Sequence, residues 1–413
     1  MSRPRSARDV ALRVLLRVFE DDAYADRAFR SEAAGLDDRD AAFAMQLAYG
    51  TIQRVRTLDH GIEALGRRPV RKLDPPVRAA LRLGAYQLAY AGSVPVHAAV
   101  NETVELVRRA RLERAVPFAN AVMRRLTIGL ADVIAGLADD TPGGAALAHS
   151  YPDWVAERWF AELGADEARA LMVAQNEPAE TVVRLNERRP AAVPGEPVPD
   201  LPGALRVERV DAAWVEQGLV WPQSRASQLV GRCVGSRPGE RTLDLCAAPG
   251  GKTTMLAGEV VAVEADEGRA RELEQTVARQ GATGVRVVRA DGRALPPGLV
   301  GFDRALVDAP CSGLGVLAAR PDMRWRATPL PELQTELLRS AVARVRPGGV
   351  VVYAVCTVNR EENEAVVDAV GLPLDDLGAE WPAYRHPRRP ELLLTLPHRH
   401  GTAGFFVARL RVP

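Results

Sequence analysis

The stretch from Asp244 to Thr253, Asp-Leu-Cys-Ala-Ala-Pro-Gly-Gly-Lys-Thr, constrains this chain more than any other. An apolar residue precedes it and Thr254-Met255-Leu256-Ala257 follows, an order that predicts a strand, a tight turn and the start of a helix over Lys252–Ala257. Gly250 and Gly251 permit a sharp turn and a close approach to a ligand. A helix start would also present free N–H groups there. We therefore expect a ligand-binding turn in an α/β fold.

An acidic residue stands twenty positions further on, where the apolar run Val260-Val261-Ala262-Val263 ends at Glu264. An acid that ends the second strand of a doubly wound fold is placed to bind ribose hydroxyls. A phosphate-binding P-loop is excluded because Cys246 occupies the position of its first glycine, and no Gly-x-Gly-x-x-Gly pattern is present. A ligand with ribose but no required pyrophosphate fits better, and S-adenosylmethionine is the commonest such ligand. A glycine turn without a ligand is the alternative.

The composition is that of a globular protein, with 47% hydrophobic and 26% charged residues among 413, a length that suggests two or three domains. No leader-type apolar stretch follows Met1-Ser2-Arg3-Pro4-Arg5, and no run is long enough to span a bilayer. The four cysteines form no Cys-x-x-Cys pair, which argues against a zinc cluster or a disulfide framework. We expect a reduced, cytoplasmic protein, acting as a monomer, with no metal and no membrane contact.

The net charge of +1 conceals an asymmetry along the chain. Residues 1–130 carry 22 Lys and Arg against 15 Asp and Glu, hence +7, and the remainder carries 32 against 38, hence −6. A basic N-terminal third suggests a polyanionic partner. The basic run Arg108-Arg109-Ala110-Arg111 and Arg124-Arg125 could contact phosphates, although a solvated helix face explains it equally well. Lysine occurs only at Lys72 and Lys252, which hints at a specific role for the lysine in the glycine turn.

Helical periodicity runs from Ala7 to about Leu130, and alternating strands and helices begin at Trp221. Between them, Gly136–His149 is expected to be a linker, and the segment from Tyr151 to the Pro-rich 190–202 stretch a small α/β module. Apolar strands alternating with amphipathic helices predict a parallel sheet covered on both faces, closed by an antiparallel hairpin. The strands expected in the sheet are Arg241–Cys246, Val260–Glu264, Val285–Ala290, Asp303–Asp308 and Val350–Thr357.

Five candidate functional residues lie at or just after strand ends: Glu264, Asp291, Asp308, Cys311 and Cys356. In an open α/β sheet, ligands bind beyond the carboxyl ends of the strands. Asp291 could accept a hydrogen bond from an adenine amine, or it could simply cap a turn before a glycine. A single cysteine is usually a small buried hydrophobe. Two cysteines at strand exits beside a cofactor site favour chemistry instead.

A thiol has a definite use in methylation of cytosine. C5 of the base is a poor nucleophile until a thiolate adds to C6, and an acid such as Asp308 at the N3 edge stabilises that adduct. After methyl transfer the C5 proton must leave before the thiol can be expelled. A second cysteine could supply or assist the base for that step.

The helical part resembles the NusB-type RNA-binding domain. The resemblance rests on Ala42–Gly50, Leu81–Leu88, Val94–Glu102 and Phe118–Arg125. It makes RNA the favoured explanation of the basic excess.

The remainder resembles the RNA cytosine-C5 methyltransferases of the Nol1/Nop2/Sun group, and the whole chain is similar to its bacterial Sun-type members. The resemblance rests on Asp244–Thr253, Asp308–Gly313 and the Cys356 segment, supported by Arg320–Trp325, Glu361-Glu362-Asn363 and Gly404–Leu410. It implies S-adenosylmethionine as cofactor and 16S rRNA, free or partly assembled, as substrate. It also implies that Cys356 is the nucleophile and that Cys311 promotes product release. The residues it implies at or around the cofactor are Cys246, Ala247, Ala248, Pro249, Gly250, Gly251, Lys252, Glu264, Asp291 and Asp308.

The expected architecture is therefore multidomain. We expect an all-α NusB-like domain over 1–135, a small α/β RNA-binding or linker module over 150–215, and a Rossmann-like methyltransferase domain over 216–413. The chain departs from the group at Val355 and Thr357, where Thr and Ser are usual, and at Glu264, where Asp is usual. The same chemistry on tRNA is one alternative. A non-catalytic RNA-binding assembly factor is the other, but such decay would normally remove a cysteine or the glycine turn, and both are present.

Overall fold

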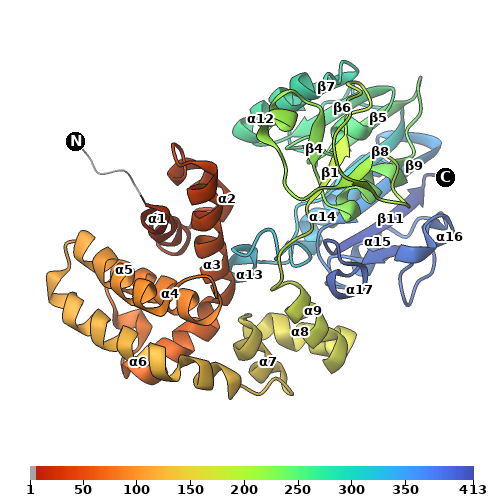
Figure 1. Ribbon diagram of the computed structural model, residues 1–413. Helices are drawn as coiled ribbons and strands as arrows, with labels where there is room; N and C mark the ends of the chain where they lie inside the picture. The colour runs from red at the N-terminus through yellow and green to blue at the C-terminus, as the bar shows by residue number, and fades with distance from the viewer. Residues whose placement is uncertain (1–5) are drawn as a thin grey trace. The chain divides into compact units, whose positions relative to one another are not determined.

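The computed structural model describes residues 6–413, so the N-terminal stretch Met1–Arg5, in which no leader was expected, lies outside the described residues. The chain divides into two compact units. The first comprises Met1–Asn176 and the short segment Ala319–Arg326, and the second comprises Glu177–Ala318 and Ala327–Pro413. Each unit has its own fold and is described by itself (Figure 1).

The first unit is helical throughout its described part. Its elements are α1 (Ala7–Phe19), α2 (Ala25–Glu32), α3 (Asp38–Gly66), η1 (Val70–Lys72), α4 (Pro75–Ala89), α5 (Val96–Arg109), η2 (Glu113–Ala115), α6 (Val116–Ala135), α7 (Pro142–His149), α8 (Asp153–Leu163), α9 (Ala165–Ala174) and α13 (Met323–Arg326). Helix α1 begins at a capping box, in which Ser6 accepts the N–H of Asp9 and the Asp9 carboxylate accepts the N–H of Ser6. The predicted helical bundle is confirmed.

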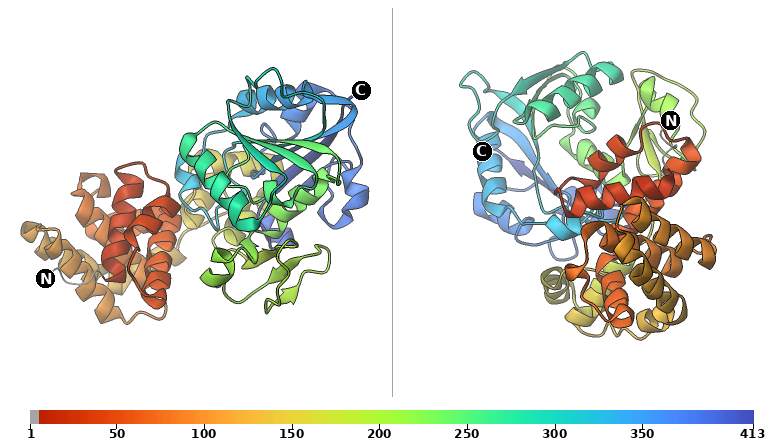
Figure 2. Two further views of the ribbon diagram at one scale, coloured as in Figure 1. Left: turned by 90° about the horizontal axis from the view of Figure 1, so that it is seen from above. Right: turned by 90° about the vertical axis from the view of Figure 1, so that its left-hand side faces the viewer.

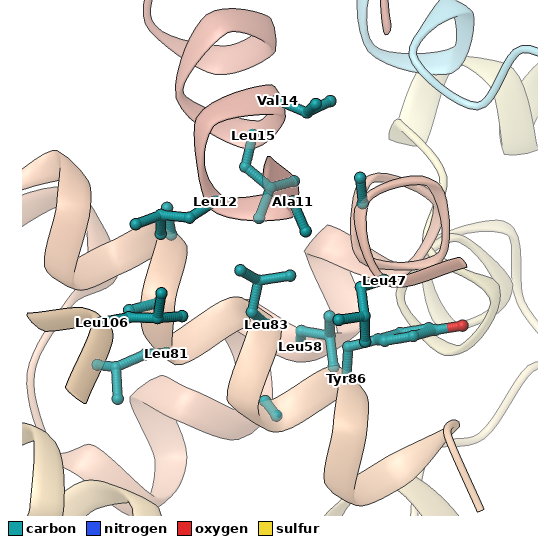
Figure 3. Close-up of a cluster of buried hydrophobic side chains, with 14 of the residues drawn as sticks. Ala11, Leu12, Val14, Leu15, Leu47, Leu58, Leu81, Leu83, Tyr86 and Leu106 are labelled. Atoms are coloured by element: carbon teal, nitrogen blue, oxygen red, sulfur yellow. The ribbon is translucent and has the colours of Figure 1, made fainter. Parts of the chain in front are cut away.

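Apolar side chains from four helices of this unit meet in one core (Figure 3). Leu12 and Leu15 of α1 lie with Leu58 of α3, Leu83 of α4 and Leu106 of α5, and all are buried. Each of these helices presents an apolar face at helical spacing, so burial of those faces drives their association.

A segment from the far end of the sequence completes this unit. Arg324 is fully buried, lies 4.0 Å from the ring centroid of Tyr151, and donates to the carbonyls of Gln53 (2.8 Å) and Ser150 (2.9 Å). Trp325 donates its ring N–H to the carbonyl of Ile52 at 2.8 Å. Burial lowers the pKa of Arg324 to about 10, so these carbonyls and the ring face offset the cost of its desolvation.

The second unit contains two sheets and the helices that cover them. Its elements are β1 (Val182–Leu185), β2 (Glu196–Pro197), β3 (Ala204–Arg206), α10 (Ala212–Glu216), β4 (Val220–Pro222), α11 (Arg225–Val234), β5 (Arg241–Leu245), η3 (Thr253–Met255), β6 (Glu259–Glu264), α12 (Glu267–Gln280), β7 (Val285–Arg289), β8 (Phe302–Asp308), α14 (Pro331–Val342), β9 (Val345–Val355), α15 (Glu364–Val370), α16 (Leu377–Glu380), η4 (Pro382–Tyr384), β10 (Leu393–Thr395), α17 (Pro397–His400) and β11 (Phe405–Arg411). The smaller sheet is antiparallel in the order β2-β3-β1-β4.

The larger sheet has the order β10-β11-β9-β8-β5-β6-β7. Its five strands from β9 to β7 are parallel, and β10 and β11 add the antiparallel hairpin predicted from the sequence. Helices lie on both of its faces (Figure 2). The predicted Rossmann-like α/β fold is confirmed, and the carboxyl ends of β5, β6, β7, β8 and β9 share one edge.

Three local expectations were wrong. The predicted helix Lys252–Ala257 is a single 3₁₀ turn, Thr253–Met255, because the chain re-enters the sheet at Glu259 and leaves no length for a helix. The expected linker 136–149 contains α7, which Thr141 caps by accepting the N–H of Gly144. The expected module 150–215 is not one body, since α8 and α9 belong to the first unit and β1, β2 and β3 to the second.

Candidate active site

Hydrogen bonds to neighbouring parts of the chain fix the loop that follows β5. Cys246 adopts a left-handed φ of 60°, the N–H of Ala247 donates to the carbonyl of Val263 at 3.1 Å, and Arg269 of α12 donates to the carbonyl of Ala248 at 2.8 Å. These bonds fix the loop over the ends of β5 and β6, which are neighbouring parallel strands.

The two glycines of the loop serve packing. A Cβ on Gly250 would lie 2.8 Å from Leu273, and one on Gly251 would lie 2.4 Å from the ring nitrogen of Trp221. Gly250 also has a φ of 103°, which side chains rarely tolerate. The structure thus shows that both glycines let the loop lie against α12 and β4, and their expected role in a close approach to a ligand stays a prediction.

Two buried carboxylates beside this loop have oxygen atoms that lack a hydrogen-bond partner among the described residues. Asp244 accepts the hydroxyl of Thr253 at 2.7 Å through Oδ2, while Oδ1 has none, and burial raises its pKa to about 7. Glu264 accepts the N–H groups of Ala265 and Asp266 through Oε1, while Oε2 accepts none and lies 3.5 Å from Arg269. Buried acceptors without donors are costly, so this edge fits a ligand that brings hydroxyl or ammonium groups.

Asp291 lies two residues beyond β7, beside the end of β6. Its carboxylate is exposed and binds Arg293 at 2.7 Å, and hydrogen bonding from Arg293 lowers its pKa. The structure thus places Asp291 at the predicted edge of the sheet, but within the described residues its side chain is bonded to Arg293 and to none of the other candidates.

A lysine and an aspartate form an ion pair between the loop and β8. Lys252 Nζ lies 2.6 Å from Asp308 Oδ2 and 4.9 Å from the centre of the Phe405 ring. The ring face stabilises the ammonium group and limits where it can move. Lys252 binds Oδ2 of Asp308, and the carboxylate is partly exposed, so Oδ1 can accept a hydrogen bond from a substrate.

Cys311 and Cys356 lie together, as expected from their strand exits. Their sulfur atoms are 3.4 Å apart. The hydrogen bond from Cys311 lowers the pKa of Cys356, and the same bond raises the pKa of Cys311 well above its ordinary value. The contact therefore favours a thiolate on Cys356 over one on Cys311, and the role of Cys356 as nucleophile stays a prediction.

The other two cysteines differ in their chemistry. Burial raises the pKa of Cys246 to about 12 and also raises that of Cys233. Both remain neutral thiols at neutral pH and are unsuited to attack.

Two residues of this edge were not singled out from the sequence. Sequence reasoning used Asp244 only as the start of the loop, although its place between Leu243 and Leu245 in a buried strand marks it as a buried acid. Phe405 was noted only within the family resemblance, and its place over Lys252 follows from the antiparallel return of β11 beside β9.

Residues 6–413 contain neither a metal-binding cluster nor a membrane-spanning helix. No cluster of three or more His, Cys, Asp or Glu side chains there could hold a metal ion. In the same range, no helix has the length and apolar character needed to cross a membrane.

Comparison with known proteins gives two family matches and many relatives. Residues 233–411 match the 16S rRNA methyltransferase RsmB/F family, and residues 5–127 match the NusB family. A probable ribosomal RNA small subunit methyltransferase B of Synechocystis is 32% identical, over 98% of this chain and 99% of its own length. A ribosomal RNA small subunit methyltransferase B of Thermus thermophilus is 35% identical, over 94% and 92%.

Solved structures share the fold. PH0851 superposes with a TM-score of 0.80 at 23% identity, over 100% of this chain and 99% of its own. NSun6 from Pyrococcus horikoshii, solved with SFG, has a TM-score of 0.55 at 22% identity, over 64% and 99%. The relatives cover almost the whole chain at more than 30% identity, and the family's members are S-adenosylmethionine-dependent RNA methyltransferases. This chain belongs to the 16S rRNA methyltransferase RsmB/F family.

Proposed function

We propose that this protein methylates C5 of a cytosine in 16S rRNA through a covalent bond between Cys356 and C6 of the base. The observation that carries the proposal is the pair of cysteine sulfurs 3.4 Å apart, with a thiolate favoured on Cys356, in the same unit as the Lys252–Asp308 ion pair. A methyltransferase for a nitrogen or oxygen atom has no need of two thiols, because those atoms carry their own lone pairs.

S-adenosylmethionine would be held at the edge formed by β5, β6 and β7. Glu264 would accept the ribose hydroxyls, Asp291 the adenine amine, and the Cys246–Lys252 loop would enclose the remainder. The free oxygen atoms of Asp244 and Glu264 support this, because they need donors that the described chain does not supply. The SFG named with NSun6 is an analogue of this cofactor. When bound, the cofactor supplies a methyl group on a sulfonium, which an electron-rich carbon can accept.

In the first step, the thiolate of Cys356 adds to C6, and the electron pair of the C5–C6 double bond moves onto C5 and toward the N3 edge. A proton that N3 takes up from solvent as the thiolate adds, held against the carboxylate of Asp308, stabilises that charge, and it returns to solvent when the adduct breaks down. Lys252 orients the carboxylate through its 2.6 Å contact. C5 thereby becomes nucleophilic enough to take a methyl group.

In the second step, the C5 proton leaves and the double bond re-forms as the C6–S bond breaks. Once Cys356 is a thioether it no longer accepts a charged hydrogen bond, so the main cause of the raised pKa of Cys311 is gone. Cys311 can then release its own proton to solvent and take the proton from C5. The Cys356 thiolate leaves with the electron pair of the C6–S bond, so the enzyme regains its nucleophile.

Replacing Glu264 by alanine should weaken cofactor binding. Two hydroxyls would lose a charged acceptor worth roughly 1.5–3 kcal/mol, which corresponds to an increase in Kd of about 10- to 150-fold. Isothermal titration calorimetry measures this directly. Glu267→Ala, an exposed glutamate three residues away at the start of α12, is the matched control and should bind normally. Unchanged affinity in a folded Glu264→Ala protein would reject the assignment.

The helical unit would bind the RNA. Its charge of +7 over residues 1–130 supports this, but not all of the predicted basic run is free. Arg108 is paired with Glu105, and Arg109 with Asp9. Arg111 and Arg124 are exposed and have no carboxylate partner among the described residues, so they are the better candidates for phosphate contacts.

Replacing Arg111 and Arg124 together by glutamine should weaken RNA binding and reduce its salt dependence. Each lost phosphate contact should lower the slope of log K against log salt by about 0.7 to 0.9. A filter-binding titration over a range of salt measures the slope. Arg286→Gln, on the edge strand β7 of the second unit, removes a charge elsewhere and should leave the slope unchanged. Equal slopes for all three proteins would remove the helical unit from RNA binding.

Sequencing of 5-methylcytosine in rRNA and tRNA from cells with and without this gene tests the proposed substrate. We expect one site in 16S rRNA to disappear. We further propose that the enzyme acts in the cytoplasm as a monomer. Loss of a tRNA site alone would assign the same chemistry to tRNA. No lost site in either RNA would indicate an assembly factor without activity.

A further inference from the structure

A buried carboxylate lies beneath the loop that carries Cys311. Glu362 is completely buried, in the turn that precedes α15. Its Oε1 accepts the N–H of Ser312 at 2.9 Å, the side-chain amide of Gln334 at 2.8 Å and the N–H of Leu330 at 3.3 Å. Its Oε2 accepts the hydroxyl of Ser312. A buried carboxylate is costly unless it is well hydrogen-bonded, and this one is bonded on both oxygens.

Glu362 and its hydrogen-bond partner Gln334 bind the two peptide groups that flank Cys311. Ser312 follows Cys311, and Glu362 binds its N–H and its hydroxyl. Pro310 precedes Cys311, and its carbonyl accepts the side-chain amide of Gln334 at 2.9 Å, the same amide that Glu362 accepts. The backbone on either side of Cys311 is therefore fixed to one buried polar cluster.

The same cluster extends to the second cysteine. Ser312 Oγ lies 2.9 Å from Thr357 Oγ1. Because the Ser312 hydroxyl donates to Glu362, the Thr357 hydroxyl is the donor in this contact. Thr357 follows Cys356 directly, so the line Glu362–Ser312–Thr357 joins the residues that follow the two cysteines. All three are buried.

We propose that Glu362 is a positioning residue that holds Cys311 and Cys356 at reacting distance through Ser312 and Thr357. It contacts neither sulfur atom in a hydrogen bond, so its effect passes through the two neighbouring hydroxyls. The inference rests on the proposed function of the two cysteines. It also explains why threonine can replace the usual serine at position 357, since the hydroxyl is kept, and why Val355 is tolerated, since its side chain is buried within β9 and outside this line.

A test that needs no methylation is the rate at which the two thiols cross-link. Diamide, an azo oxidant that takes up two protons and two electrons as two thiols become a disulfide, should join Cys311 to Cys356 rapidly in the full-length protein. Glu362→Ala should slow this cross-link at least 10-fold, and Glu362→Gln should slow it less because it keeps the volume and one acceptor. Thr357→Val should also slow it, while Thr357→Ser should react like the natural protein. Peptide mass spectrometry identifies the disulfide.

Glu364→Gln is the matched control. Glu364 is a second buried glutamate two residues along, and it lies 3.1 Å from His386 instead of the cysteine loops. Its replacement should lower thermal stability without changing the cross-linking rate. Thermal melting of every variant shows which are folded, and Thr357→Val provides the answer if Glu362→Ala does not fold.

Steady-state methylation kinetics provide a second measurement. The folded Glu362 and Thr357→Val variants should lose about 10- to 100-fold in kcat with unchanged KM for RNA and cofactor, because misplacement of reacting groups affects the chemical steps. If folded Glu362→Ala and Thr357→Val cross-link at the rate of the natural protein and keep its kcat, the inference is overturned. If cross-linking slows while the natural protein methylates no cytosine, the positioning inference stands and the proposed function fails.

Discussion

Cys356→Ala should abolish methylation, with a loss of at least roughly 10⁴-fold in rate, as when an enzyme loses its covalent nucleophile. Without a thiolate at this position no bond to C6 can form, and C5 of the base stays unactivated. Transfer of a radioactive methyl group from S-adenosylmethionine to 16S rRNA measures the loss. Calorimetry should show that the variant still binds the cofactor, because the residues proposed to hold it are unchanged.

Cys233→Ala is the control for the loss of a thiol as such. Cys233 is buried on α11, and its neutral thiol has no place in the proposed chemistry. The variant should lose some stability and keep its rate. If Cys356→Ala methylates the same cytosine at the natural rate, both cysteines of the site become simple core residues and the proposed mechanism fails.

Cys311→Ala should behave differently from Cys356→Ala. Attack by Cys356 and methyl transfer remain possible, but the C5 proton no longer has its base, so the thiol is expelled slowly. A covalent enzyme–RNA complex should then accumulate, and it should appear as a slowly migrating band on a denaturing gel. The double variant should show no band, since the bond to RNA is made by Cys356.

The lowered pKa of Cys356 predicts a pH dependence for the natural enzyme. The thiolate that the Cys311 hydrogen bond stabilises should support methylation at a pH at which an ordinary thiol is largely protonated, and Cys311→Ala, which lacks that bond, should need a higher pH to form its band. If Cys311→Ala turns over normally while Cys356→Ala traps RNA, the two roles are reversed.

The arrangement of the candidate residues followed from the sequence because parallel strands place their carboxyl ends on one edge. Asp308 and Cys311 leave β8, Cys356 leaves β9, and these strands are neighbours. The proximity of the two sulfur atoms, which lie 3.4 Å apart, could therefore be predicted from the sequence. The closing hairpin was foreseeable too, since Gly404–Val412 alternates strand-forming residues after a turn.

Features that depend on tertiary contact were not foreseeable. The glycines of the loop lie against Leu273 and Trp221, which no local pattern reveals. Arg324 was placed by sequence order in the methyltransferase domain, yet it is buried in the helical unit, because its partners at Tyr151 and Gln53 lie far away in the sequence. A deletion of the helical part would therefore expose this segment, and point substitutions test RNA binding more cleanly.

Glu362 illustrates the same limit. In the sequence it is one of two adjacent glutamates before a helix, a position typical of a solvated surface. Only the folded chain brings Ser312, Gln334 and Leu330 to it, from two separate segments, the loop after β8 and the start of α14. A buried charge is specified by its partners, and those partners are distant in sequence.

The proposed bond between Cys356 and C6 of a cytosine can be trapped in the natural enzyme. In 16S rRNA made with 5-fluorocytidine, C5 carries fluorine in place of a proton, so the final elimination cannot occur and the adduct should persist. Digestion and mass spectrometry should then find methylated 5-fluorocytidine attached to the peptide that contains Cys356. Attachment to the Cys311 peptide, or methylation with no attachment to either peptide, would rule out a covalent role for Cys356.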